Sequence, residues 1–118
     1  RMQRKHQQWF LGKSLDGFCP MGPCIVTRDE IANVGQLRVQ TRVNDELRQD
    51  GYVRDMIFDI PSLIETLSAG MTLEPGDIIA TGTPAGVGMG FKPPKFLQKG
   101  DKVSITISSI GTLVNTVV

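Results

Sequence analysis

The chain has 118 residues, 40% of them hydrophobic, and its 13 basic and 12 acidic residues leave a formal net charge of +1. This length fits one small domain or a part of a larger one, and the composition is that of a globular chain. The near-neutral charge gives no electrostatic basis for binding nucleic acid or an anionic membrane, and because no apolar run approaches ~20 residues we expect neither a membrane span nor a signal peptide.

The first part of the chain combines a polar stretch with an irregular segment. Residues 1–8 are compatible with a helix but have no capping residue and follow no strand, so we expect the chain to be part of a longer protein. Residues 17–23 contain two glycines and two prolines, which predicts an ordered loop. Cys19 and Cys24 lack the spacing and histidine partners of a zinc site, so we expect reduced thiols and a cytoplasmic protein.

A β-hairpin is the clearest β signal. Residues 25–27 precede it and read as a short strand, and residues 28–31 read as a helical turn. Residues 37–43 then alternate apolar and polar side chains, residues 44–45 (Asn-Asp) suit a tight turn, and residues 46–49 return. We expect one face of this hairpin to be exposed to solvent.

Residues 60–69 are the best helix prediction. Apolar side chains recur at helical spacing at Ile60, Leu63, Ile64 and Leu67. Asp59 can cap the start, Pro61 suits the first turn and Gly70 suits the end. We expect the apolar face to be buried against a sheet.

The second half of the chain contains two similar turns. Residues 73–79 and 97–103 each place Gly-Asp just before a β-branched run, which indicates shared turn chemistry. The run at 77–80 reads as a strand, and two further strands are expected at 103–107 and 112–118. Together these elements predict an α+β, mostly β domain with a mixed sheet.

A glycine-rich segment follows the strand-like run. Residues 81–88 read Thr-Gly-Thr-Pro-Ala-Gly-Val-Gly. The glycines allow the backbone to turn or to approach another group closely, and Thr81 and Thr83 add hydroxyl donors. We interpret the segment as a place where backbone approaches a ligand. An ordinary tight turn is the alternative.

Lys13 is the other candidate for chemistry. It follows the apolar residues 9–11, so its ammonium group could hold a carboxylate or an enolate beside a partly dry wall. The alternative is a surface lysine whose stem covers Trp9. The Gly-Lys-Ser triplet around it is not a phosphate-binding loop, because Gln7 stands where that loop needs a glycine. His6 is interpreted as an exposed helix residue.

Four segments together closely resemble the fumarylacetoacetate hydrolase family. They are QWFLGKSLDGFCPMGP at 8–23, TRVNDELRQD at 41–50, DMIFD at 55–59 and LEPGDIIATGTPAGVG at 73–88. The match runs in order along essentially the whole chain. It implies a mixed β-sheet roll with short flanking helices, incomplete at the N-terminus, in which residues 1–118 are the C-terminal part of one catalytic domain. It also implies a homodimer.

The resemblance carries over to only a few site residues. Lys13 matches the family's active-site lysine, and Thr83 matches the threonine that hydrogen-bonds a substrate carboxylate or carbonyl, with Thr81 and Gly82 beside it. Gln3 matches the glutamine of an Ala-Arg-Asp-x-Gln segment, although Arg1 stands where the family has aspartate. The family uses Mg²⁺ or Mn²⁺, whose Glu-x-Glu and aspartate ligands match no residue of this chain.

The resemblance implies metal-dependent hydrolysis of C–C bonds in acylpyruvate-type dicarbonyl acids. This chain then holds part of an active site and is inactive alone. One alternative is an oxaloacetate decarboxylase, or an isomerase of unsaturated dicarboxylic acids, on the same platform. Another is a non-catalytic remnant of the fold that serves in dimerisation or interaction.

Overall fold

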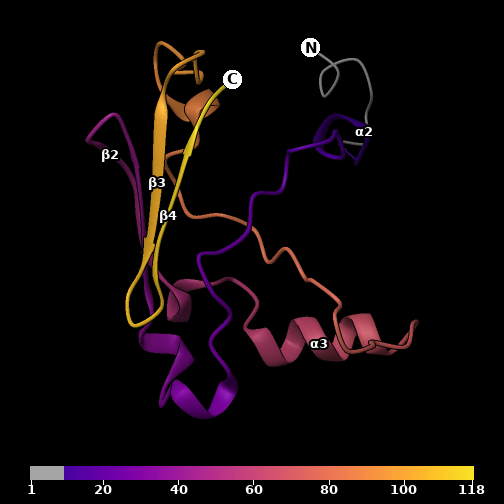
Figure 1. The fold of residues 1–118 in the computed structure, drawn as a ribbon. Coiled ribbons are helices and arrows are strands. Elements are labelled where there is room, and N and C mark those ends of the chain that lie inside the picture. The colour runs from indigo at the N-terminus through magenta and orange to yellow at the C-terminus, as the bar shows by residue number, and fades with distance from the viewer. Residues whose placement is uncertain (1–9) are drawn as a thin grey trace.

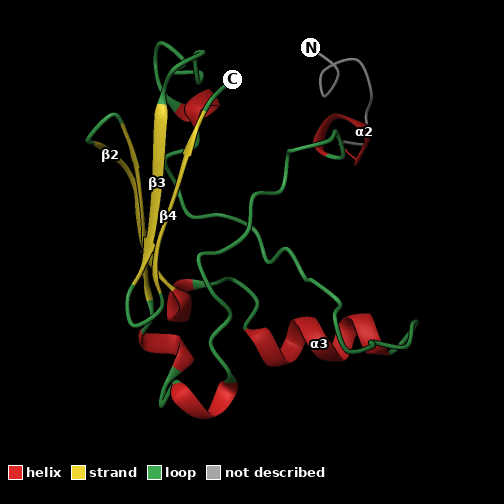
Figure 2. Cartoon of the chain, viewed as in Figure 1, coloured by secondary structure: helices red, strands yellow, loops and turns green. Residues whose placement is uncertain are grey.

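The computed structural model describes residues 10–118. One antiparallel sheet in the order β2-β1-β3-β4 is formed by β1 (Arg38–Val43), β2 (Glu46–Tyr52), β3 (Lys102–Ile107) and β4 (Gly111–Thr116) (Figure 1). The helices are α2 (Phe10–Lys13) and α3 (Ile60–Ser68), with single 3-10 turns η1 (Arg28–Glu30), η2 (Val34–Gln36), η3 (Val53–Asp55) and η4 (Gly88–Gly90) (Figure 2).

The predicted hairpin is confirmed as β1 and β2. Asn44 and Asp45 form the turn with positive φ angles of 48° and 69°, which these residue types tolerate. The Asn44 amide also donates to Asp101 Oδ1 over 2.7 Å and accepts from the Lys102 backbone N–H over 2.8 Å. The turn is thereby joined to the start of β3, which pairs with the other side of β1.

The sheet has one apolar and one polar face. On the apolar face Thr41 stands opposite Ile105 and Val43 opposite Val103, and Val43 is buried. On the other face Arg38 donates to the Asp50 carboxylate from Nε over 2.7 Å and from Nη2 over 2.5 Å. The solvent-exposed face expected for the hairpin is confirmed.

A β-bulge shifts the register between the first two strands. Thr41 stands opposite Gln49, but the next residue of β1, Arg42, stands opposite Leu47. Arg48 is therefore the extra residue on β2. The bulge leaves Gln49 and Gly51 on the same side of the sheet as Thr41, which is the apolar side.

Helix α3 forms at the predicted residues. The Asp59 carboxylate accepts from the Ser62 backbone N–H over 2.9 Å, which satisfies one of the free donors of the first turn. The expected packing is wrong, because Figure 1 shows α3 beside the sheet and not across its face. Its apolar side is only half-buried, and Ile64 is 45% exposed. Leu63 and Leu67 face residues 77–81 instead.

Three β predictions are corrected. Residues 25–27 and 77–80 belong to no strand, and the sheet is antiparallel rather than mixed. A strand requires hydrogen bonds to a neighbouring strand, which an apolar sequence alone does not supply. Within residues 10–118, neither segment has such a neighbour.

The shared turn chemistry is confirmed. In both turns an aspartate side chain accepts a hydrogen bond from the backbone N–H three residues earlier. The Glu74 N–H donates to Asp77 over 2.8 Å, and the Gln98 N–H donates to Asp101 over 2.8 Å. The loop at 17–23 has no regular element, and its cysteine and the next one are free thiols, as expected. Across the described residues, no helix has the length and apolar character that crossing a bilayer requires.

Candidate substrate-binding site

The glycine-rich segment, residues 81–88, lies against strand β2. The side-chain amide of Gln49 donates to Thr83 Oγ1 over 2.6 Å and to the Pro84 carbonyl oxygen over 2.9 Å. Gly51 lies so close to Pro84 that an added Cβ would stand 3.1 Å from the proline Cβ. A side-chain anchor and a close approach of the backbone therefore hold the start of the segment on the sheet.

Two glycines of the segment have different surroundings. Gly86 has φ of +108°, and a Cβ there would lie 1.8 Å from the carbonyl oxygen of Arg48, so only glycine fits. Gly82 has φ of +100°, but no atom lies within 4 Å of the position of its Cβ. The backbone at residue 86 is packed against the sheet, whereas the backbone at residue 82 is open.

A groove of about 570 Å³ opens beside the anchored segment, and we call it the threonine groove. The lining residues that have polar side chains are Thr81, Thr83, Tyr52 and Asp55. Its apolar walls come from Val39, Val53, Met56, Ile57, Phe58 and Leu63. An apolar groove with a few polar residues in its lining suits a small ligand with a polar end, such as a carboxylic acid.

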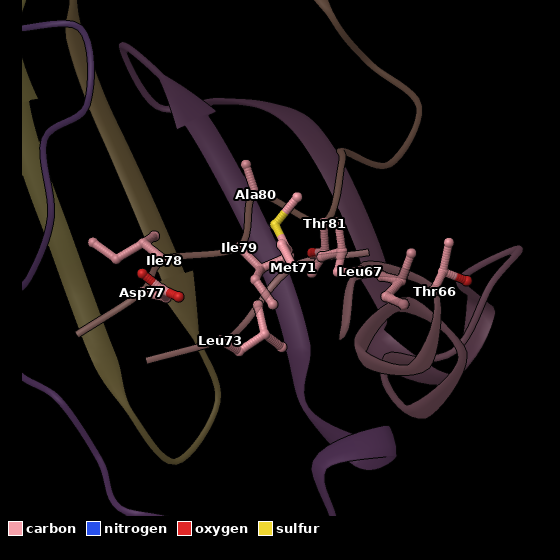
Figure 3. Close-up of a pocket in the computed structure, with 10 residues that line it drawn as sticks. Thr66, Leu67, Met71, Leu73, Asp77, Ile78, Ile79, Ala80 and Thr81 are labelled. Atoms are coloured by element: carbon pink, nitrogen blue, oxygen red, sulfur yellow. The ribbon is translucent and has the colours of Figure 1, made fainter. Parts of the chain in front are cut away.

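A second groove, of about 550 Å³, lies between α3 and residues 77–81, and we call it the helix groove. Figure 3 shows Leu67, Met71 and Ile79 around this space, with Thr81 close to Met71 and Leu67. Thr81 also lines the threonine groove. Residues 77–80, which were predicted as a strand, therefore line the helix groove, and the next residue, Thr81, lines both grooves.

A charged cluster includes Lys95, whose backbone N–H donates to the carbonyl oxygen of Gly88, the last residue of the glycine-rich segment, over 2.9 Å. Lys95 Nζ lies 2.5 Å from the Glu46 carboxylate and 4.9 Å from the centre of the Phe91 ring. Arg48 Nε lies 3.1 Å from the same carboxylate, without the alignment of a hydrogen bond. The hydrogen bond from Lys95, with a smaller contribution from Arg48, lowers the pKa of Glu46 below its ordinary value. The cluster lines neither groove, so we assign it a supporting role.

Lys13 is at the end of α2 and is exposed. The Ser14 hydroxyl donates to the Phe10 carbonyl oxygen over 2.6 Å and closes this single helical turn. Lys13 lines neither groove, and Figure 1 shows α2 apart from both α3 and the sheet. Gln3 lies outside the described residues. The meeting of Lys13, Gln3 and Thr83 at one substrate therefore stays a prediction.

The described residues do not fit a metal centre. Between residues 10 and 118, no three His, Cys, Asp or Glu side chains are grouped so that they could hold a metal ion. Asp55 lines the threonine groove, and its carboxylate accepts from the Tyr52 backbone N–H over 3.3 Å. Because Mg²⁺ and similar cations require several oxygen ligands in a fixed geometry, we assign no chemical step to a metal at these residues.

Sequence reasoning did not identify Gln49 as part of the site. The residue lies within the motif at 41–50, but no local pattern indicates that its side chain reaches a residue 34 positions further along the chain. The same holds for Tyr52, Asp55 and the residues that follow η3. The one available indication was that the motifs at 41–50 and 73–88 both belong to the family resemblance, which suggests that they contribute to the same site.

Comparison with known proteins places this chain in a family. The family model described as "Fumarylacetoacetate (FAA) hydrolase C-terminal" matches residues 1–118. The chain belongs to the fumarylacetoacetate hydrolase family. The resemblance carried by the four sequence motifs is thereby confirmed, and its sheet and helices are part of a fumarylacetoacetate hydrolase-type fold.

Three similar proteins illustrate the relationship. The oxaloacetate tautomerase YisK of Bacillus subtilis (strain 168) is 64% identical over 116 residues, which are 98% of this chain and 38% of that protein. The solved fumarylacetoacetate hydrolase of psychrophilic Exiguobacterium antarcticum has a TM-score of 0.94 and 54% identity over 98% of this chain and 42% of that one. The maleylpyruvate hydrolase of Sphingobium sp. SYK-6, solved with manganese(II) and pyruvate, has a TM-score of 0.79 and 48% identity over 87% of this chain and 36% of that one.

These comparisons change which of the expected activities is best supported. The chain spans 38% of the length of the tautomerase and 42% of that of the solved hydrolase. The similar proteins bear the names of a tautomerase, of hydrolases and of isomerases. The expectation that placed C–C bond hydrolysis first is therefore less well supported than its alternative, an isomerising or oxaloacetate-converting enzyme on the same platform.

Proposed function

We propose that residues 1–118 are the C-terminal part of a catalytic domain that interconverts the enol and keto forms of oxaloacetate or a closely related 2-keto dicarboxylic acid. The observation that carries this proposal is the 64% identity to the oxaloacetate tautomerase over 98% of the chain. In this reaction a proton leaves the enol oxygen and another is added to C3. An enolate lies between the two forms, so the site must orient carboxylates and stabilise negative charge.

The threonine groove supplies the orienting groups. Thr83 carries a hydroxyl whose oxygen is fixed by Gln49 over 2.6 Å, and it lines the groove together with Thr81 and Gly82. The hydroxyl of Thr83 would hydrogen-bond a substrate carboxylate, and the open backbone at Gly82 would let the substrate approach closely. Fixed donors hold the reacting carbon in one place relative to the groups that exchange protons.

Lys13 and Gln3 complete the proposed set of substrate-contacting residues. The ammonium group of Lys13 would neutralise part of the enolate charge, which is larger in the transition state than in the bound keto form. Gln3 would contact the substrate through its amide. This role requires α2 to meet the threonine groove in the substrate-bound protein.

Hydrolysis of an acylpyruvate is the second candidate. It is supported by the TM-score of 0.94 to the solved fumarylacetoacetate hydrolase. Breaking the C–C bond of an acylpyruvate also leaves an enolate beside a carboxylate, so the same residues would serve. Decarboxylation of oxaloacetate leaves the same kind of enolate.

A non-catalytic module is the least supported alternative, because it gives no reason for an anchored hydroxyl beside an open groove. We expect the intact protein to be a homodimer.

The intact protein, with Mn²⁺ present, should be assayed on three substrates. Loss of the ultraviolet absorbance of enol-oxaloacetate measures tautomerisation, pyruvate release from oxaloacetate measures decarboxylation, and pyruvate release from an acylpyruvate measures hydrolysis. We expect tautomerisation to have the highest kcat/KM. Faster cleavage of the acylpyruvate would replace the proposal with the hydrolase.

Two substitutions test the proposed site. Lys13→Ala should lower kcat by about 10²-fold, the loss typical of one preorganised electrostatic donor. Thr83→Val should chiefly raise KM, with a net loss of about 1 to 3 kcal/mol in kcat/KM, because its hydrogen bond serves bound substrate and transition state alike. Lys99→Ala, in an exposed turn, is the control and should match the parent. Parent-like turnover of Lys13→Ala would make Lys13 a surface residue.

A further inference from the structure

We propose that Gln49 is a positioning residue that fixes the Thr83 hydroxyl as a hydrogen-bond donor toward the threonine groove, and so selects a ligand that presents a carboxylate or enolate oxygen there. This inference rests on the proposed function, since it describes how the same site recognises its substrate. It assigns a role to a side chain on β2 that lies 34 positions before the threonine in sequence.

The orientation of the Gln49 amide follows from its partners. A carbonyl oxygen can only accept, so the atom that lies 2.9 Å from the Pro84 carbonyl oxygen must be the NH₂ nitrogen and not the amide oxygen. The same nitrogen lies 2.6 Å from Thr83 Oγ1. Its two hydrogens therefore serve these two acceptors, and Thr83 Oγ1 is an acceptor in this pair.

The direction of the Thr83 proton follows in turn. Because Oγ1 accepts from Gln49, the hydroxyl hydrogen must point elsewhere. The neighbouring Pro84 carbonyl oxygen lies 3.4 Å from Oγ1, which is long for a hydroxyl donor. Thr83 is exposed and lines the groove, so an oxygen of a bound carboxylate is the better acceptor. A charged acceptor also strengthens the bond.

The surrounding backbone keeps Gln49 in place. The bulge at Arg48 sets the register so that Gln49 stands opposite Thr41, on the side of the sheet where residues 83 and 84 lie. The contacts of Gly51 with Pro84 and of Gly86 with Arg48 fix the distance between strand and segment. A half-buried side chain held between two fixed backbones has little freedom to turn its amide round.

The chemistry of the ligand is defined by this arrangement. A hydroxyl that already accepts one hydrogen bond offers the ligand a donor. A carboxylate or an enolate oxygen, which only accepts, matches that donor. A ligand that presented an amine or amide N–H at Thr83 would meet only the second lone pair of its neutral hydroxyl, which gives a weaker hydrogen bond than the one from the hydroxyl to a carboxylate. The arrangement therefore discriminates by hydrogen-bond polarity as well as by shape.

The test uses three variants of the intact protein. Gln49→Leu removes the donor, and Gln49→Glu keeps the shape but can only accept when ionised. Gln40→Leu is the matched control, because Gln40 lies on the neighbouring strand and donates to Asp50 over 3.1 Å on the polar face. The steady-state constants for oxaloacetate and the thermal midpoint are measured for each.

We expect Gln49→Leu to raise KM by about tenfold, the effect of losing one hydrogen bond to a charged group, with kcat changed far less. Gln49→Glu should raise KM further, because its charge repels the substrate carboxylate. Gln40→Leu should leave both constants unchanged. Parent-like KM values for both Gln49 variants would overturn the inference. If Gln49→Leu does not fold, Gln49→Glu decides alone.

A double-mutant cycle separates positioning from general stability. If Gln49 acts through the Thr83 hydroxyl, adding Gln49→Leu to Thr83→Val should change KM by less than about twofold. A purely structural role predicts that the two effects multiply, and that result would overturn the inference.

Binding of pyruvate, measured by calorimetry with Mn²⁺ present, distinguishes a failure of the role of Gln49 from a failure of the proposed function. If the parent does not tautomerise oxaloacetate but binds pyruvate more tightly than Gln49→Leu does, the proposed function fails and the role of Gln49 stands. If the parent tautomerises oxaloacetate and Gln49→Leu equals it in KM and in pyruvate affinity, only the role of Gln49 fails.

Discussion

Gly86 and Gly76 have nearly the same backbone angle, with φ of +108° and +103°. At Gly76 no atom lies within 4 Å of the position of a Cβ, so glycine there only permits a turn. At Gly86 the Cβ would meet the backbone of Arg48 at 1.8 Å. Glycine at residue 86 therefore permits both a turn and the contact that brings the glycine-rich segment to β2.

This pair gives a prediction for single residues. Gly76→Ala should cost about 1 to 2 kcal/mol of unfolding free energy, the cost of a left-handed backbone angle for an L-residue. Gly86→Ala adds a collision with backbone and should cost more than about 3 kcal/mol in total. Denaturant unfolding of the intact protein measures both. Equal losses would mean that the segment moves freely away from β2.

Among the elements, α3 is specified by its own ends. Asp59 accepts from the Ser62 backbone N–H over 2.9 Å, and Pro61 stands in the first turn, where its missing N–H has no cost. The hydrogen bonds from the Ser62 side chain and backbone also lower the pKa of Asp59. The start of the helix is therefore fixed by local chemistry, even though its apolar side is only half-buried.

The cap predicts how two substitutions differ. Asp59→Ala leaves a first-turn donor unsatisfied and should lower the thermal midpoint by about 2 to 4 °C. Asp59→Asn keeps the cap and should lie within about 1 °C of the parent, since asparagine caps as well as aspartate. Thermal unfolding followed by circular dichroism measures both. Equal midpoints for the two variants would mean that the cap does not limit stability.

Over the whole molecule, ionised carboxylates join elements that are distant in sequence. Arg38 lowers the pKa of Asp50, and the Lys95 hydrogen bond lowers that of Glu46. Backbone and Asn44 hydrogen bonds lower the pKa of Asp101, which ties the β1–β2 turn to the start of β3. The ordinary values are 3.8 for aspartate and 4.5 for glutamate.

These shifts predict the dependence of stability on pH. A carboxyl whose pKa is lower in the folded state binds fewer protons there than in the unfolded state, so its stabilisation is present above the ordinary pKa. It is lost as the pH falls below about 4.5 and through the lowered values. We expect the urea midpoint of the intact protein to be constant from pH 7 to 5 and to fall from pH 5 to 3.

The control for this prediction is salt. Glu46 and Asp50 are exposed and paired with cations, so 0.5 M NaCl should weaken the pH dependence by screening these ion pairs. A midpoint that rises between pH 5 and 3 would contradict the prediction, because it would require carboxyls with raised pKa values to dominate.

The sequence by itself determined the elements whose causes are local. The β1–β2 hairpin follows from alternation around Asn44 and Asp45, and α3 follows from helical spacing behind Asp59. The paired turns before Asp77 and Asp101 follow from their shared Gly-Asp pattern. The family followed from motifs that occur in order along the chain, and the role proposed for Thr83 rests on the same resemblance. In these elements the interacting residues lie within a few positions of one another, and the family shows in separate motifs that occur in a fixed order along the chain.

Only the tertiary structure decided what depends on distant partners. Residues 77–80 have the composition of a strand, but a strand exists only where another segment accepts and donates its hydrogen bonds. The contact between Gln49 and Thr83 depends on the bulge at Arg48 and on the space left by Gly86, none of which changes the local sequence pattern. Backbone hydrogen-bond pairing and close packing join residues regardless of their separation in the chain, so neither periodicity nor a short motif reports them.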